Sequence, residues 1–161
     1  MGHMSTATTL RIKSTSSEAT EQLAASIGHQ LRGGEVIELV SDLGGGKTTF
    51  VRGLARGAGS EDRVASPTFT VSKEYAAKAF TIHHFDFYRL QEAGIVADEL
   101  AEVAGDTHDV VVVEWADVVH HVLPAKRLTI TIKQLPTGDR ELQFHTPHAL
   151  SYLVQSVKGA N

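Results

Sequence analysis

The chain has 161 residues, a net charge of −4 with neutral histidines, and no cysteine. The lack of cysteine excludes disulfides, thiolate zinc sites and cysteine nucleophiles, and the 15 lysines and arginines are too scattered for a protein that binds nucleic acid by itself. No apolar run approaches the roughly 20 residues of a membrane span. We expect a single cytoplasmic domain over residues 5–161, with no membrane or direct DNA contact, and interpret residues 1–4 as the remnant of an expression tag.

The first third of the chain predicts two strands, each followed by a helix. A short alternating strand is expected over residues 8–13, and the serine pair at 16–17 offers N-cap hydroxyls to a helix that ends at the glycine pair 33–34. The apolar residues 35–40 predict a strand, and a helix over residues 47–58 follows the glycine cluster after it.

The rest of the chain predicts further strands and short helices. Two β-rich segments precede a helix and a second very apolar strand, and a short helix, a hairpin and a last helix follow. Two continuous apolar strands, each followed by a helix, imply a parallel sheet covered on both faces, while alternating strands imply antiparallel additions. The fold class we expect is therefore α/β and three-layered. The segments are 68–75, 79–87, 95–103, 109–114, 116–122, 127–135, 140–144 and a helix from Pro147.

A phosphate-binding loop is predicted between the strand at 35–40 and the helix that begins at Lys47. A polyphosphate needs inward-facing backbone N–H groups, which glycine-rich loops and helix N-termini supply. Lys47 would reach the β and γ phosphates, and the Thr48 hydroxyl would complete a magnesium shell. The strict pattern has glycine where this chain has Ser41, and a glycine-rich turn with a chance Gly-Lys-Thr is the alternative. The loop residues we expect to bind nucleotide are Asp42, Leu43, Gly44, Gly45, Gly46, Lys47, Thr48 and Thr49.

Three further candidates lie near the same sheet edge. Glu114 ends the apolar strand 109–114, and ligands of α/β sheets bind at the carboxyl ends of strands, so it is either a metal ligand or an ordinary surface acid. The neighbouring Trp115 either flanks the nucleotide or belongs to the core. Thr68, in Ser66-Pro67-Thr68, either senses the γ phosphate or belongs to a plain turn.

Asp86 lies between phenylalanines at the end of a predicted strand, where burial of its charge is costly without a partner. It either pairs with Arg89 or another cation, or serves a metal and its water. Strand alternation places His83 and His84 on opposite faces, so the two do not form a shared metal site.

Six blocks of sequence, in order and almost end to end, resemble the TsaE (YjeE) family of small bacterial ATPases, which are required for threonylcarbamoyladenosine modification of tRNA. The resemblance implies a P-loop NTPase-like fold, ATP and Mg²⁺ as ligands, Glu114 as second metal ligand and Asp86 as the acid needed for hydrolysis. It also implies that Thr68 lies in a switch-like loop, that Trp115 lies near the nucleotide, and that Thr20 and Arg127 line its adenosine side. The blocks are the SSEAT segment, GGEVIELVSDLGGGKTTFVRGLARGAG, VASPTFTVSKEY, HHFDFYRL, VVVVEWAD and LPAKRLTITI.

The function we expect is Mg²⁺-dependent ATP hydrolysis by in-line attack of water, with Asp86, Lys47 and Thr68 as the catalytic set. The resemblance implies TsaB and TsaD as partners, with tRNA reached only through that complex. Arg52 and Arg56 have the spacing of a solvent-facing pair, and Arg89 is the remaining candidate for an arginine finger. Without a certain finger, we expect slow turnover by the chain alone. The alternatives are a small-molecule kinase and a non-hydrolysing, nucleotide-controlled interaction module.

Overall fold

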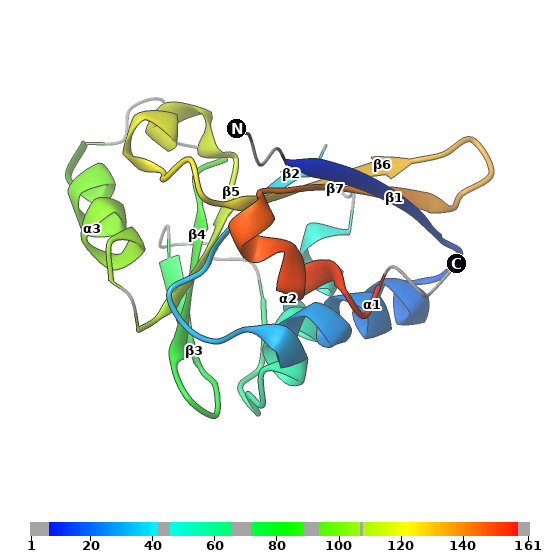
Figure 1. Cartoon of the computed structure of the whole chain (residues 1–161), viewed down its shortest axis with the longest axis horizontal. Coiled ribbons are helices and arrows are strands. Elements are labelled where there is room, and N and C mark those ends of the chain that lie inside the picture. Colours follow the sequence, from blue (N-terminus) through cyan, green and yellow to red (C-terminus); the bar gives the residue numbers. More distant parts are fainter. Residues whose placement is uncertain (1–6, 42–45, 66–71, 89–93, 107, 158–161) are drawn as a thin grey trace, which may run out of the picture.

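The computed structural model describes residues 7–41, 46–65, 72–88, 94–106 and 108–157. Within these ranges the strands form one sheet of seven, in the order β1-β7-β6-β2-β5-β4-β3 (Figure 1). Their bounds are Thr8–Ser14 (β1), Val36–Ser41 (β2), Ser72–Ala76 (β3), Thr81–Asp86 (β4), Val110–Glu114 (β5), Leu128–Gln134 (β6) and Arg140–Thr146 (β7).

The centre of the sheet is parallel and its two ends are antiparallel, which confirms the predicted class. Strand β2 pairs in parallel with both β5 and β6, and β5 pairs in parallel with β4. The pairs β6–β7, β7–β1 and β4–β3 are antiparallel. The carboxyl ends of β6, β2, β5 and β4 therefore meet at one edge, where a ligand of an α/β sheet is expected to bind.

Helices cover both faces of this sheet. Helices α1 (Ser17–Gln30) and α2 (Lys47–Gly57) pack on one face together with the 3-10 helix η2 (His148–Val154). Helix α3 (Gly94–Ala104) and the 3-10 helix η1 (Ala116–Val122) pack on the other face, near β4 and β5 (Figure 1). The two short helices predicted near Ala116 and Pro147 are thus present, and both are of the 3-10 type. No helix in the described ranges is long and apolar enough to cross a bilayer.

Helix α2 lies so close to α1 that their backbones touch. A Cβ atom built on Gly53 would lie 2.2 Å from the carbonyl oxygen of Glu21, and one on Gly57 would lie 2.0 Å from that of Ala25. Only glycine fits at such distances, so these two positions set the approach of the helices. This contact holds α2 against α1 and so orients the helix whose first turn lies at the carboxyl edge of the sheet.

Candidate functional site

The first turn of α2 presents a buried cation at the carboxyl edge of the sheet. Gly46, the N-cap of the helix, has φ 99°, a left-handed conformation that favours glycine. The Lys47 side chain follows it, 8% exposed, and its Nζ donates to the carbonyl oxygen of Ser41 at 3.1 Å. Thr48 and Thr49 are half-buried in the same turn. The predicted residues Asp42, Leu43, Gly44, Gly45 and Thr68, and also Arg89, lie outside the described residues.

Ser41 occupies the position at which the strict loop pattern has glycine. It is the last residue of β2 and pairs in register with Ile132 of β6. The only non-glycine residue with positive φ in the described part of the chain is Trp115, so Ser41 has an ordinary backbone conformation. Nothing in its backbone geometry requires glycine.

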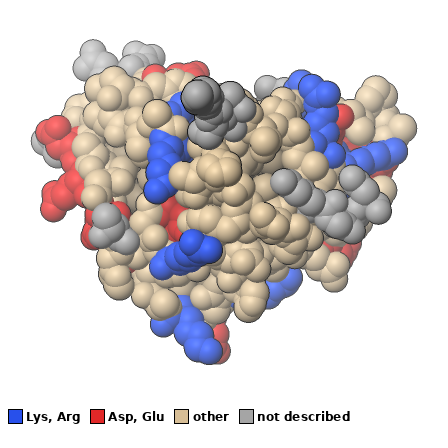
Figure 2. Space-filling view, viewed as in Figure 1, with Lys and Arg blue, Asp and Glu red and all other residues tan. Residues whose placement is uncertain are grey.

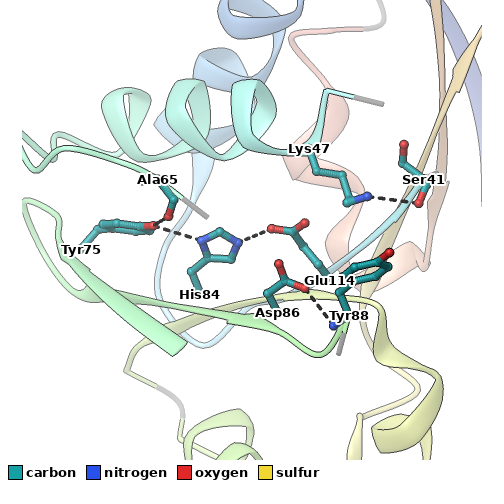
Figure 3. A network of polar contacts seen from close by, with 8 residues as sticks. All are labelled: Ser41, Lys47, Ala65, Tyr75, His84, Asp86, Tyr88 and Glu114. Carbon is teal, nitrogen blue, oxygen red and sulfur yellow. Dashed lines mark hydrogen bonds and ion pairs between the residues drawn. The ribbon is translucent and has the colours of Figure 1, made fainter. Parts of the chain in front are cut away.

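Two carboxylates end neighbouring parallel strands beside Lys47. Asp86 of β4 and Glu114 of β5 are register partners, so their side chains leave the same face of the sheet (Figure 3). Glu114 is only 2% exposed, which excludes the alternative of an ordinary surface acid. The predicted meeting of Glu114 with the phosphate loop at this edge thus agrees with the position of Lys47.

The Asp86 carboxylate is half-buried and accepts a hydrogen bond from the backbone N–H of Tyr88 at 3.0 Å. Burial raises its pKa above the usual value, and the negative charge of Glu114 adds to this effect. The Tyr88 N–H and the charges of His84 and Lys47 act in the opposite direction but do not cancel the rise. The result is a carboxylate held at an energetic cost, a common property of groups that transfer protons or orient water.

His84 is a member of this site that the sequence interpretation missed. Its ring is fully buried and connects Tyr75 to Glu114, with 3.1 Å from Nδ1 to the Tyr75 oxygen and 2.5 Å from Nε2 to Glu114 Oε2. His83 instead contacts Asp109 and Glu74, so the two histidines face opposite ways as predicted. The available signal was the shared strand face of His84 and Asp86.

Trp115 has a left-handed backbone conformation, with φ 55° and ψ 53°. A large residue in this region costs roughly 1–3 kcal/mol and is common at functional sites. The Lys47 ammonium lies 4.7 Å from the centroid of its ring, and the Tyr88 ring lies 5.0 Å away on centroids. Trp115 therefore packs on the cation that is predicted to bind phosphate.

Two hollows open beside these residues. One, of about 530 Å³, is bounded by Ser41, Trp115, Asp117 and Lys133 among other residues. The second, of about 520 Å³, lies between Thr48 and the segment that ends at Ala65. The first hollow thus lies at the carboxyl end of β2, and the second reaches the first turn of α2 at Thr48.

Of the two residues predicted to line the adenosine side, Thr20 lies near the start of α2 and Arg127 does not. The Thr20 hydroxyl is buried and bonds to Ser14 at 2.6 Å, and Ser14 is the register partner of Arg140. The Nε atom of Arg140 lies 3.8 Å from the position that a Cβ on Gly46 would take, so Arg140 lies beside the N-cap of α2, whereas Thr20 contacts the strand partner of Arg140. Arg140 is a second site candidate that the sequence interpretation missed.

Arg127 lies away from this edge. It precedes Leu128, which is level with Ile37 near the start of β2, whereas Ser41 is level with Ile132. Its Nε donates to the buried Glu38 at 2.9 Å and its Nη1 to the carbonyl oxygen of Pro124 at 2.9 Å. The structure therefore does not bring Arg127 to Lys47.

The residues present fit a small hard cation that keeps part of its water shell. Carboxylate and hydroxyl oxygens are available from Asp86, Glu114 and Thr48, which are the donors that Mg²⁺ prefers. Within the described ranges no group of three or more acidic, histidine or cysteine side chains forms a closed metal cage. Mg²⁺ in nucleotide sites is bound by one or two side chains together with phosphate and water, so an open site of this kind is expected.

Comparison with known proteins gives the family. The family described as threonylcarbamoyl adenosine biosynthesis protein TsaE matches residues 14–142. The chain belongs to the TsaE family. The TsaE protein of Bacillus subtilis is 36% identical over 137 residues, which cover 84% of each chain. That of Treponema pallidum is 35% identical over 133 residues, which cover 83% of this chain and 98% of the other. Among solved structures, the crystal structure of Bacillus subtilis YdiB aligns with a TM-score of 0.78 at 31% identity, over 99% of both chains.

TsaE proteins are P-loop nucleotide-binding proteins, and the family assignment agrees with the geometry at the start of α2. The resemblance seen in the sequence is thereby confirmed, as is the P-loop fold, because the 99% coverage by YdiB spans the whole sheet and both helical layers.

Proposed function

We propose that this TsaE protein binds and hydrolyses ATP with Mg²⁺, and that it does so in the cytoplasm as a subunit of the machinery that forms threonylcarbamoyladenosine in tRNA. Three kinds of support converge. The curated relatives are named for threonylcarbamoyladenosine biosynthesis in tRNA. The helix that begins at Lys47 has the form of a phosphate-binding helix. Two carboxylates face its first turn.

One observation carries the hydrolytic part of the proposal. Asp86 and Glu114 are register partners at the carboxyl ends of β4 and β5, and the Lys47 charge acts on Asp86. Figure 3 shows Lys47 above the pair, with its ammonium directed toward Ser41. A cation for the phosphates and two acids for metal and water thus meet where the sheet ends.

Each residue then has a distinct role. Lys47 neutralises phosphate charge, and Thr48 and Glu114 hold Mg²⁺, which when bound supplies further charge stabilisation to the transferring phosphoryl group. Asp86 orients the attacking water and accepts its proton, and its raised pKa brings it closer to the range in which a general base is effective. Trp115 packs against Lys47 and shields its ammonium from solvent on that side.

The arginines suggest why turnover by the chain alone is expected to be slow. Arg52 and Arg56 are about half exposed and both pair with Glu21 of α1, and Arg52 also lines the hollow beside Thr48. Arg140 lies beside Gly46, with its Nε 3.8 Å from the position that a Cβ on Gly46 would take, and is a further candidate to contact phosphate. An arginine aligned on the γ phosphate raises phosphoryl transfer by on the order of 10³-fold or more, and a partner often supplies it.

TsaB and TsaD are the partners we propose, and tRNA is reached through them. The surface supports an indirect contact with RNA. On the face shown in Figure 2 the lysines and arginines are dispersed among neutral residues, and the chain as a whole is acidic. A protein that depends on phosphate neutralisation for RNA binding needs a clustered basic surface.

The test is release of inorganic phosphate from ATP, measured for the purified chain with and without TsaB and TsaD. Lys47→Ala is expected to lower the rate on the order of 10²–10³-fold, because one preorganised charge on the transferring group is lost. Lys126→Ala, which removes an exposed lysine far from the edge, is the matched control and is expected to keep the wild-type rate.

Each outcome separates the candidate functions. Equal rates for wild type and Lys47→Ala would assign the activity to a contaminant. Phosphate release with water as the only acceptor argues against a kinase. Binding of ATP and ADP with background turnover, even in the presence of both partners, would instead identify a non-hydrolysing interaction module.

A further inference from the structure

A continuous line of hydrogen bonds reaches Glu114 from behind the site, through two side chains that the proposed mechanism does not use, Tyr75 and His84. It begins at the backbone carbonyl of Ala65 and passes through the Tyr75 hydroxyl and the His84 ring to Glu114 (Figure 3). The three side chains are 1%, 0% and 2% exposed. Because they are shielded from water, each group depends on its neighbour in the line for its hydrogen bond.

The direction of these bonds follows from the number of hydrogens available. A carbonyl oxygen only accepts, so the single hydroxyl hydrogen of Tyr75 is donated to Ala65 at 3.0 Å. The Tyr75 oxygen must then accept from Nδ1–H of His84. This bond fixes the plane of the imidazole ring and directs its Nε2 at Glu114 Oε2, and the 2.5 Å separation of these two atoms requires a second hydrogen between them, on Nε2 or on the carboxyl group.

The same line joins two parts of the site that are distant in sequence. Glu114 is the strand-terminal carboxylate of β5, and His84 is separated from it by 30 residues. At the other end, Ala65 is the last described residue before the Ser66-Pro67-Thr68 segment, three positions before Thr68. A shift of the backbone at Ala65 therefore acts on the carboxylate through two side chains.

We propose that His84 is a positioning residue that orients Glu114, and that Tyr75 links this orientation to the backbone at Ala65. The inference deepens the function proposed above and rests on Glu114 belonging to the Mg²⁺ site. Partners that orient a metal-binding side chain typically change metal affinity by about 10–100-fold when removed. His84 thus tunes how strongly Mg²⁺ supports nucleotide binding.

Two amide substitutions separate the two bonds of the ring. In His84→Asn the amide nitrogen lies near the place of Nδ1 and keeps a donor for Tyr75, but the partner of Glu114 is lost. In His84→Gln the amide lies near the place of Nε2 and keeps a donor for Glu114, but the bond to Tyr75 is lost. Tyr75→Phe removes only the hydroxyl oxygen and keeps the ring.

The measurement is ADP affinity by calorimetry, with Mg²⁺ and with EDTA, together with the melting temperature of each variant. The ratio of the two affinities reports the metal contribution and is insensitive to a general loss of folded protein. In His84→Asn we expect this ratio to fall by about 10–100-fold with the EDTA affinity unchanged. In His84→Gln we expect the ratio to stay near the wild-type value. The ratio of Tyr75→Phe is expected to lie between those of His84→Gln and His84→Asn.

The outcomes distinguish this inference from the proposed function. If the wild-type ratio is one, or if Glu114→Gln leaves it unchanged, the assignment of Glu114 to the Mg²⁺ site fails. If Glu114→Gln lowers the ratio but His84→Asn and Tyr75→Phe do not, only the positioning role fails. If His84→Asn and His84→Gln lower the melting temperature equally and both keep the wild-type affinity ratio, His84 has only a structural role in the core. If His84→Asn does not fold, Tyr75→Phe provides the test: a lowered affinity ratio supports the positioning role, and a wild-type ratio contradicts it.

Discussion

Asp86 and Glu114 occupy the same register position on two adjacent parallel strands, and their carboxylates extend from the same face of the sheet. Two acids placed in this way repel each other, and the Glu114 charge contributes to the raised pKa of Asp86. Such an arrangement has a folding cost. It is retained where positive charge arrives with a ligand, which is what the site at Lys47 would provide.

Asp86→Asn is expected to abolish function while stabilising the fold. A raised pKa means that the folded chain binds this proton more tightly than the unfolded chain, so stability falls as pH rises above the usual value of 3.8 toward the folded-state pKa. At neutral pH the amide removes this cost, so the melting temperature should rise. Hydrolysis should fall by roughly 10²–10⁴-fold as the proton acceptor is lost.

Asp98→Asn, on the exposed face of α3, is the control for that experiment and should change neither quantity. A melting temperature of Asp86→Asn below that of the wild type would show that the carboxylate is a structural group rather than a strained functional one.

Glu38→Gln is expected to destabilise the chain in a pH-dependent manner. Burial acts to raise the Glu38 pKa, but hydrogen bonds from His120 and Arg127 outweigh it and hold the pKa below its usual 4.5. The stability that the carboxylate contributes is therefore present above pH 4.5 and is lost as pH falls through the folded-state pKa. Urea unfolding should show a loss of about 2 kcal/mol at neutral pH.

The difference between Glu38→Gln and the wild type should shrink in acid, whereas Glu99→Gln on the exposed face of α3 should match the wild type throughout. A constant difference across pH would contradict the assignment of the effect to the ionised carboxylate.

Gly53→Ala is expected to destabilise the chain although alanine is the better helix former. The added methyl group would lie 2.2 Å from the Glu21 carbonyl oxygen, and relief of this overlap requires α1 and α2 to separate. Overpacking of this kind costs about 1–3 kcal/mol, against a gain of about 1 kcal/mol in helix propensity. Arg52→Ala, an exposed change in the same helix, should stay within about 0.5 kcal/mol in chemical unfolding. Equal stability of both variants would show that the helices separate at no cost.

The single tryptophan is expected to report nucleotide binding. Lys47 lies 4.7 Å from the Trp115 ring centroid, so a phosphate that attracts the ammonium changes the electrostatic surroundings of the indole. Titration with ADP should therefore change the emission of the wild type and leave Lys47→Met unchanged over the same range. Calorimetric binding of ADP without any emission change would place the ligand away from this lysine.

The order of the elements was predictable because each rests on local pattern. Apolar runs gave β2 and β5 as buried central strands, alternation gave the β6–β7 hairpin, and Ser16 caps α1 as expected. The placement of Glu114 at the sheet edge where Lys47 lies was also predictable, since carboxyl ends of parallel strands share one edge.

Contacts that depend on register between distant strands were not predictable in this way. His84 meets Glu114 only because β4 pairs with β5 in one of several possible registers, and a shift by one residue would turn His84 to the other face. Arg140 reaches Gly46 because of the position of β7 beside β6. Arg127 directly precedes β6, so the parallel pairing of β6 with β2 places it at the amino end of the strand, opposite the edge where Lys47 lies.

The glycine contact between α1 and α2 also decides which part of the molecule is able to respond to a ligand. A helix that slides or tilts must exchange one set of interlocked contacts for another, and at Gly53 and Gly57 the two backbones are already too near to pass each other. We therefore expect the far end of α2 to stay in place when a ligand binds. Lys47 instead interacts with the Trp115 ring and with the charge of Asp86, so we expect a change of shape on ligand binding at the carboxyl ends of β4 and β5.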